Sequence, residues 1–176
     1  MEKTISTKRV FDGKVIRIDF DEVELDDGTR SFREVVNHNG GACIALKDKD
    51  NKFFMVKQYR YALKKEMYEF CAGKIEKDEN PDEAIKRECV EELGYSCKNV
   101  KKFNYVVPTC GYDNEKIHLY YGEVDEKLSQ NFDEDERIEV YKFTFDEINE
   151  MILNGVIDDA KTIVLMYRIK MEGLDK

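Results

Sequence analysis

The sequence predicts an α/β fold, with a mixed β-sheet between helices and a small antiparallel β unit at the N-terminus. Three observations support this class. Short apolar runs typical of strands recur along the chain, well-marked helix starts interrupt them irregularly, and a glycine-containing break near residue 40 separates the first strands from the rest. With 176 residues, the chain is long enough to bury a sizeable core.

Two strands are expected in the first part of the chain. Residues 14–25 alternate between apolar and polar, with one phase slip that predicts a bulge or bend. A turn at 26–28 leads into a returning strand over 30–36. So small an antiparallel unit cannot bury both of its faces unaided. We therefore expect residues 1–38 to form a β unit that docks on something, and residues 39–176 to form the main domain.

The main domain shows further strands and two C-terminal helices. Apolar runs predict strands over 42–46, 53–59, 100–107, 117–122 and 138–143, with a polar acidic loop over 123–136 and no clear assignment for 60–70. Thr144 and Glu147 form a capping box for a helix ending at Asn154 and Gly155. Asp158 is expected to start the final helix.

A third helix has the clearest boundaries in the sequence. Asn80 is a good N-cap, Pro81 suits the first helical position, and Glu83 lies where a capping-box acid reaches back. The helix is expected to run to Leu93, where Gly94 supplies the left-handed residue that ends it.

Several carboxylates lie beside the apolar stripe of this helix. At roughly 100° per residue, Glu92 lies only about 60° from the centre of the buried stripe and Glu88 about 100°, whereas Glu91 points further out. Acidic side chains four residues apart at the edge of a buried face repel each other and lose hydration. A hard divalent cation such as Mg²⁺ between them would remove both costs.

The spacing of the fixed residues is more specific than the acidic run alone, which by itself usually marks a solvated helix face. The pattern G-x5-E-x7-R-E-U-x-E-E-x-G-U is matched at every fixed position by Gly73, Glu79, Arg87, Glu88, Glu91, Glu92 and Gly94. A chance match has a probability on the order of 10⁻⁶. The chain therefore resembles the Nudix hydrolases, which implies an α/β/α sandwich. Cys89 and Tyr95 occupy two slots where an aliphatic residue is more typical.

Composition excludes several functions. The net charge of −9, from 38 acidic and 29 basic residues, argues against coating nucleic acid or binding an anionic membrane. No apolar stretch approaches 18 residues, and the N-terminus has no signal-like apolar segment, so a soluble cytoplasmic protein is expected. An odd number of cysteines without metal-ligand spacing predicts buried, reduced thiols at Cys43, Cys71, Cys89, Cys97 and Cys110.

Outside the box, the chain resembles the ADP-ribose pyrophosphatase branch of the family. The segments that carry this resemblance are MVKQYRYALKKEMYEFCAGKIE, TCGYDNEKIHLYYGEV, DEDERIEV and GVIDDAKTIVL. Cys71 and Cys110 stand where the branch usually has prolines. The resemblance implies hydrolysis of ADP-ribose to AMP and ribose 5-phosphate, and a homodimer that exchanges its N-terminal β-domains. Hydrolysis of another nucleoside diphosphate sugar or of a dinucleotide, and non-catalytic nucleotide sensing, are the alternatives; the complete box favours an enzyme.

The resemblance also implies a role for each residue of the box. Glu88 and Glu92 would be the main ligands of Mg²⁺, with Mn²⁺ as an alternative metal; Glu91 would assist, and the carbonyl of Ala72 would complete the ligand set. The remaining box residues are expected to be structural. Glu79 would pair with Arg87 to hold the loop against the helix, while Gly73 and Gly94 would serve the backbone.

Catalytic and substrate residues outside the box are also implied by the branch. Glu136 of the acidic loop matches the general base, Glu134 is the neighbouring alternative, and Glu91 is the first candidate if the base belongs to the box instead.

Residues that contact the substrate would come from several segments. Arg60 matches an arginine that binds substrate phosphate, and Arg33 would stack on the adenine of the partner subunit's substrate. Glu69 and Glu115 match acids on the substrate or metal side, and Gly111 belongs to the loop regarded as a substrate signature.

Overall fold

The computed structural model describes residues 1–131 and 137–176. The chain divides into two compact units, each described here by itself. The first unit contains residues 1–40 and 107–116, and the second contains 41–106 and 117–176. Glu134 and Glu136 lie outside the described residues.

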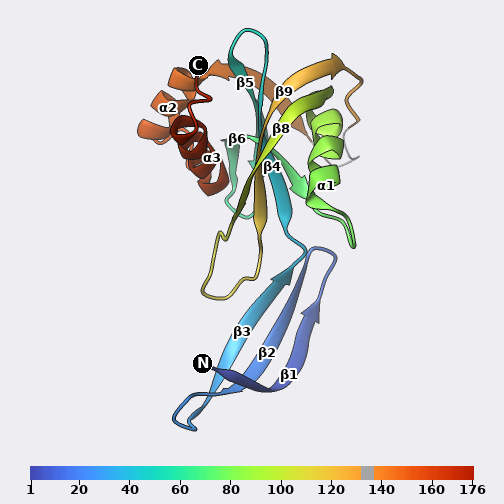
Figure 1. Ribbon diagram of the computed structural model, residues 1–176. Coiled ribbons are helices and arrows are strands. Elements are labelled where there is room, and N and C mark those ends of the chain that lie inside the picture. The colour runs from blue at the N-terminus through green and yellow to red at the C-terminus, as the bar shows by residue number, and fades with distance from the viewer. Residues whose placement is uncertain (132–136) are drawn as a thin grey trace. The chain divides into compact units, whose positions relative to one another are not determined.

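The first unit is a three-stranded antiparallel sheet (Figure 1). Its strands, in the spatial order β1-β2-β3, are β1 (Lys3–Asp12), β2 (Ile16–Glu24) and β3 (Arg30–His38). The sequence did not predict β1, because every residue of this strand is exposed and no apolar periodicity marks it. Residues of the loop 107–116 add to the same unit, since the N–H of Val36 donates to the carbonyl of Tyr112 at 2.7 Å.

The predicted bulge in residues 14–25 is wrong. β2 and β3 pair in one continuous register, and the register shifts lie instead between β1 and β2, beside Ile5 and Val10 of β1. The phase slip has another cause. Phe20 lies on one face of β2, whereas the buried Asp19 and Val23 lie on the other, so the apolar side chains change face while the strand stays regular.

The second unit is built on a mixed sheet with the strand order β10-β5-β4-β9-β8, while β6 pairs with β5 and β7 with β4. The central pair β4 and β9 is parallel, and the other pairs are antiparallel. The strands are β4 (Gly41–Lys47), β5 (Lys52–Arg60), β6 (Lys65–Glu69), β7 (Cys71–Lys74), β8 (Tyr95–Val106), β9 (Ile117–Lys127) and β10 (Ile138–Thr144).

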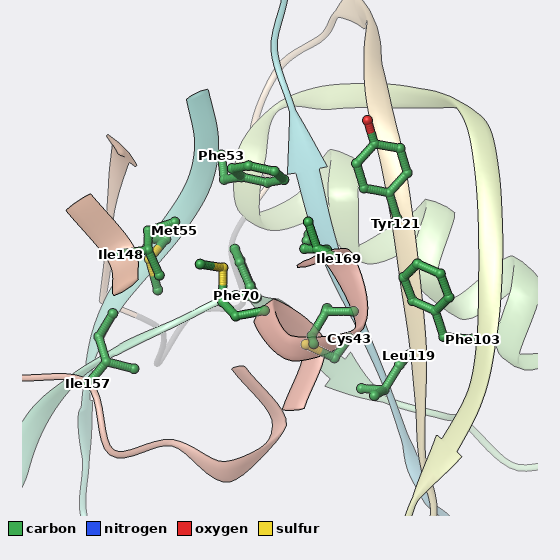
Figure 2. Packing of buried hydrophobic residues seen from close by; sticks show 13 residues of the cluster. Cys43, Phe53, Met55, Phe70, Phe103, Leu119, Tyr121, Ile148, Ile157 and Ile169 are labelled. Atoms are coloured by element: carbon green, nitrogen blue, oxygen red, sulfur yellow. The ribbon is translucent and has the colours of Figure 1, made fainter. Parts of the chain in front are cut away.

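Helices cover both faces of this sheet (Figure 1). They are α1 (Pro81–Glu88), continued by the π-helical turn η1 (Cys89–Leu93), then α2 (Phe145–Leu153) and α3 (Ala160–Met171). Alternate residues of β4 belong to different core clusters: Cys43 packs with α2 and α3, and Ile44 packs with α1 and η1. Figure 2 shows the first of these clusters. A sheet buried on both faces between helices is the α/β/α sandwich that the sequence predicted.

Several predicted boundaries change. The unassigned segment 60–70 contains β6, and the expected acidic loop is strand as far as Lys127, because β9 continues its pairing with β8. The capping box at Thr144 is confirmed. The cap of the final helix is Asp159 rather than Asp158, because the side chain of Asp159 accepts the N–H of Thr162 at 3.0 Å.

The cysteines are less uniformly buried than predicted. Cys43, Cys71 and Cys89 are buried, but Cys97 is half-buried and Cys110 is exposed on the loop of the first unit. All are free thiols. Within the part of the chain that the structure describes, no helix is both long and apolar enough to span a membrane.

Candidate functional site

The acidic helix begins as the sequence predicts. The side chain of Asn80 accepts the N–H of Asp82 at 2.9 Å, and Pro81 is the first helical residue. Glu83 accepts from Nζ of Lys86 at 3.0 Å, so its side chain supports the exposed helix face instead of completing the predicted capping box. The N-terminus is therefore fixed by one capping side chain and a proline.

The end of the helix differs from a regular α-helix. Its last turn, η1, is π-helical, and Gly94 ends it with φ of +74°. A π-turn inserts one extra residue into the hydrogen-bonding ring, which rotates the side chains that follow it and is common at functional sites. Both Glu88, just before this turn, and Glu92, within it, become buried, with 8% and 3% exposure. Two carboxylates near the end of the helix are thus shielded from water.

Gly73 makes room for one of these carboxylates. A Cβ placed on Gly73 would lie 1.8 Å from Cδ of Glu88. Because glycine has no side chain, the space beside Gly73 holds this carboxylate, and we call that space the Gly73 cradle. On the same strand, the N–H of Ala72 donates to Oε2 of Glu92 at 3.3 Å. β7 thus contacts both buried carboxylates.

Arg87 balances the charge of this cluster. Its Nε and Nη2 donate to the two oxygens of Glu79 at 3.0 and 3.1 Å, and Nη1 donates to Glu88 at 2.7 Å and to Glu91 at 2.8 Å. The hydrogen bonds with Arg87 hold the pKa of Glu79 below its usual value, and those with Glu79 raise the pKa of Arg87. One guanidinium therefore joins the loop to the helix and bridges two box carboxylates.

The donor chemistry of the cluster fits a hard divalent cation. Glu88, Glu91, Glu92 and the carbonyl of Ala72 offer oxygen ligands, which Mg²⁺ and Mn²⁺ prefer. Among residues 1–131 and 137–176, no three acidic, histidine or cysteine side chains stand in a metal-binding arrangement. The cation between Glu88 and Glu91 in this structure is the guanidinium of Arg87.

A second charged cluster lies at the junction of β5, β6 and α3. Glu69 is only 2% exposed, and its two oxygens accept from Nε and Nη2 of Arg60 at 2.6 and 2.7 Å. Lys161 also pairs with Glu69, and it pairs with Asp159 at 3.0 Å. Sequence reasoning selected Arg60 and Glu69 but missed Lys161. The signal was present, because Lys161 lies in the segment GVIDDAKTIVL that resembles the family.

The first unit carries the remaining sequence-selected residues. A pocket of about 550 Å³ is lined by Arg33 and Gly111 together with the aromatic rings of Phe20, Phe32 and Tyr112. The rings of Phe20 and Phe32 stack at 5.0 Å between centroids. Sequence reasoning missed both of them, although an exposed aromatic pair on facing strands is a recognisable signal.

Two acidic residues of the first unit lie beside basic side chains. Glu2 accepts from Nε of Arg33 at 2.9 Å and from Nη2 at 2.5 Å. Glu115 lies 3.3 Å from Nδ1 of His38. The structure thus groups Arg33 with Gly111, places Glu115 in the same unit, and assembles the box residues with Ala72 in the other unit.

Comparisons with known proteins agree with this geometry. The family model described as the NUDIX domain matches residues 37–166. The chain is 36% identical to a methanol dehydrogenase activator from Bacillus methanolicus and 34% identical to an ADP-ribose pyrophosphatase from Bacillus subtilis, in each case over 97% of this chain and 94% of the relative. It is 33% identical to a GDP-mannose pyrophosphatase from Cronobacter sakazakii, over 82% of this chain and 81% of the relative.

A solved structure supports the fold. The crystal structure of an ADP compounds hydrolase superposes with a TM-score of 0.84, at 15% identity, and covers 98% of this chain and 95% of that one. The family model, the relatives and the intact box spacing point the same way, and the chain belongs to the NUDIX domain family.

Proposed function

We propose that this protein is a Mg²⁺-dependent hydrolase of nucleoside diphosphate sugars, and that its preferred substrate is ADP-ribose, which it cleaves to AMP and ribose 5-phosphate. One observation carries the proposal: Glu88 and Glu92 are buried side by side on a single helical turn, with Glu91 and the Gly73 cradle beside them. Buried acids are costly without positive charge beside them; in this structure Arg87 supplies it to Glu88, and a bound divalent cation would supply it to both acids.

The box residues would hold the metal. Glu88, Glu91 and Glu92 would supply carboxylate oxygens, and Ala72 its carbonyl oxygen. A bound divalent cation would neutralise charge on the diphosphate and make water a better nucleophile. Arg87 would keep the loop that starts at Gly73 against the helix through Glu79, as it does in this structure.

The chain's own residues would perform the remaining tasks. Glu136 would take the proton from the attacking water, with Glu134 or Glu91 as the alternative base. Arg60 would bind substrate phosphate, because a guanidinium matches phosphate oxygens with paired donors. Glu69 would hold Arg60 in place.

The pocket of the first unit would take the nucleobase. Phe20 and Phe32 present flat apolar rings, and Arg33 adds a cation that stacks on aromatic systems. Such a surface accepts any purine. GDP-mannose is therefore the second candidate substrate, favoured by the relatives named GDP-mannose pyrophosphatases. We also propose a cytoplasmic homodimer in which the N-terminal β units are exchanged, so that Arg33 would act on the partner's substrate.

A substrate panel tests the proposal. The protein would be incubated with ADP-ribose, GDP-mannose and other nucleoside diphosphate sugars in Mg²⁺, and the products identified. We expect AMP and ribose 5-phosphate to form fastest, EDTA to abolish the reaction and Mg²⁺ to restore it. Turnover that persists in chelator would mean that the carboxylate cluster has another role.

Variants of the box connect this activity to the site. Glu92→Gln and Glu88→Gln should each lower kcat by several orders of magnitude and keep the fold, because the change removes charge at nearly constant shape. Glu83→Gln, on the exposed face of the same helix, is the matched control and should leave kcat unchanged. Near-native turnover of either buried variant at saturating Mg²⁺ would contradict the proposed ligand set.

A further inference from the structure

Glu69 pairs with two cations from different elements, Arg60 and Lys161. The two oxygens of Glu69 accept from Nε and Nη2 of Arg60, and Oε2 also accepts from Nζ of Lys161. A carboxylate can accept about four hydrogen bonds, so the paired donors of Arg60 leave acceptor sites for a second cation. Burying Lys161 has a cost, because its side chain is only 11% exposed and a buried ammonium loses its hydration, and the ion pairs with Glu69 and Asp159 offset that cost.

The position of Lys161 fixes Glu69 to a rigid part of the fold. Lys161 is the second residue of α3, and its Nζ also pairs with Asp159, the cap of that helix. The other oxygen of Asp159 accepts the N–H of Thr162 at 3.0 Å, and Oγ1 of Thr162 accepts the N–H of Phe70 at 3.0 Å. The strand that carries Glu69 is thus tied to the start of α3 at two points.

Glu69 contacts only part of the guanidinium of Arg60. Glu69 takes Nε and Nη2, so Nη1 is the donor that Glu69 does not use. The guanidinium is also in the electrostatic field of Glu92 from the box. An arginine at the end of a strand, with 40% of its side chain exposed, would otherwise lose considerable rotamer entropy on binding a phosphate.

We infer that Lys161 is a positioning residue, which fixes Glu69 and through it holds the guanidinium of Arg60 ready for the diphosphate of the substrate. The inference rests on the proposed function, since it gives Arg60 a phosphate to bind. The carboxylate that Lys161 anchors orders Arg60 before the substrate arrives, so less rotamer entropy is lost on binding.

Lys161→Met tests this role, because methionine keeps the apolar stem and removes the charge. A phosphate contact made equally in the ground and transition states contributes to KM, so KM for ADP-ribose should rise about tenfold while kcat changes less than about threefold. Lys161→Arg should restore most of the loss. An unchanged KM with only a lower Tm would mean that Lys161 is merely structural, and would overturn the inference.

The chain offers a matched control. Lys65 pairs with Asp158 on the surface and joins the same strand, β6, to the segment before α3. Among the described residues, Lys65 has no recorded hydrogen bond or ion pair with Glu69. Lys65→Met should therefore leave KM at the wild-type value. An equal rise in KM in both variants would show that any loosening of this junction has the same effect, and would overturn the specific role of Lys161.

A double-mutant cycle shows whether Lys161 acts through Arg60. The Arg60→Lys variant has already lost the paired donors of the guanidinium. Adding Lys161→Met to that variant should therefore raise KM by less than about twofold. A further tenfold rise in that background would mean that Lys161 acts independently of Arg60, which contradicts the inference.

Direct binding separates this inference from the proposed function. A wild-type protein that hydrolyses no nucleoside diphosphate sugar would refute the proposed function alone. Calorimetric titration with ADP-ribose in the presence of EDTA then decides the role of Lys161, since Lys161→Met should weaken Kd about tenfold relative to both wild type and Lys65→Met. Equal affinities, or binding by none of the three proteins, would overturn it.

Discussion

The absence of one side chain shapes the acidic site. The carboxylate of Glu88 lies where a side chain at Gly73 would be, with only 1.8 Å between its Cδ and an added Cβ. A glycine at this position is thus required by close approach of a neighbouring group, because its backbone does not adopt a positive φ. The position is sensitive to the smallest possible substitution.

Gly73→Ala should therefore damage activity more than stability. The added methyl must push the Glu88 carboxylate aside, and a displacement of about 1 Å in a catalytic group can cost about 100-fold in rate. Overpacking should lower the free energy of unfolding by about 1–3 kcal/mol. Gly122→Ala is the control, since its Cβ would meet the end of the apolar Ile44 side chain at 3.0 Å and no carboxylate of the box. Equal losses of kcat in the two variants would contradict this explanation.

Glu136 carries the proposed base function. A base acts on the proton in transit and contributes little to binding, so Glu136→Gln should lower kcat and kcat/KM together, by about 10²–10⁴, and leave KM nearly unchanged. Glu134→Gln should have a much smaller effect. Steady-state kinetics of both variants measure the difference. If Glu134 proves to be the damaging position, the assignment within the loop is shifted; if neither matters, Glu91 becomes the base to test.

At the scale of single residues, sequence succeeded where partners are close along the chain. Glu79 and Arg87 are eight positions apart, and box spacing is enough to predict that they pair, as the structure records. Lys161 was missed because its partner Glu69 is far away in sequence, so the pair depends on how α3 docks on β6. Phe20 and Phe32 were missed because the contact between their rings depends on the register in which β2 pairs with β3.

At the scale of elements, helix ends were predicted better than helix interiors. The caps at Asn80 and Thr144 follow from local side-chain chemistry and were found from sequence. The π-turn after Glu88 was not, since residue periodicity assumes a constant number of residues per turn. Exposed β1 was missed for a related reason, because an apolar pattern reports burial and this strand has none.

The junction between β6 and α3 should make stability depend on pH. Burial alone would raise the pKa of Glu69, but the hydrogen bond from Arg60 and the charge of Lys161 outweigh it and lower the pKa. A depressed carboxyl pKa stabilises the folded protein above the unfolded-state value of about 4.3, and this contribution is lost as the pH falls through the folded-state pKa.

Glu69→Gln isolates that contribution. At pH 7 it should lower the free energy of unfolding by about 3 kcal/mol, because Arg60 and Lys161 lose a buried partner. The difference from wild type should shrink as the pH falls below the unfolded-state pKa of about 4.3, because the unfolded chain then binds a proton that the folded Glu69, with its lowered pKa, does not yet bind. Urea denaturation at pH 7, 5 and 3.5 measures the difference, and a gap that stays constant over this range would contradict the assignment.

At the scale of the whole molecule, the two units differ in self-sufficiency. Both core clusters of the second unit consist of its own residues, whereas the three-stranded sheet leaves Phe32 and every residue of β1 exposed. Deleting residues 1–38 should therefore leave either an insoluble core or a monomeric core that binds substrate poorly. Light scattering and KM measurements check this. A soluble monomer with unchanged KM would count against both the exchange and the role of Arg33.

The parallel pairing of β4 with β9 has a consequence for the order in which the chain folds. β4 pairs with β5 next to the short connection between them. Its parallel pairing with β9, in contrast, joins residues far apart in the sequence, such as Gly41 and Ile117. Pairing between such distant segments is slow, and it must wait until β9 has been made. β1 to β3, which are joined by short turns, can pair while the ribosome is still adding the rest of the chain. A nascent chain that ends before Ile117 carries the whole acidic helix but no parallel neighbour for β4, and at that length its apolar strands are most exposed to chaperones and to aggregation.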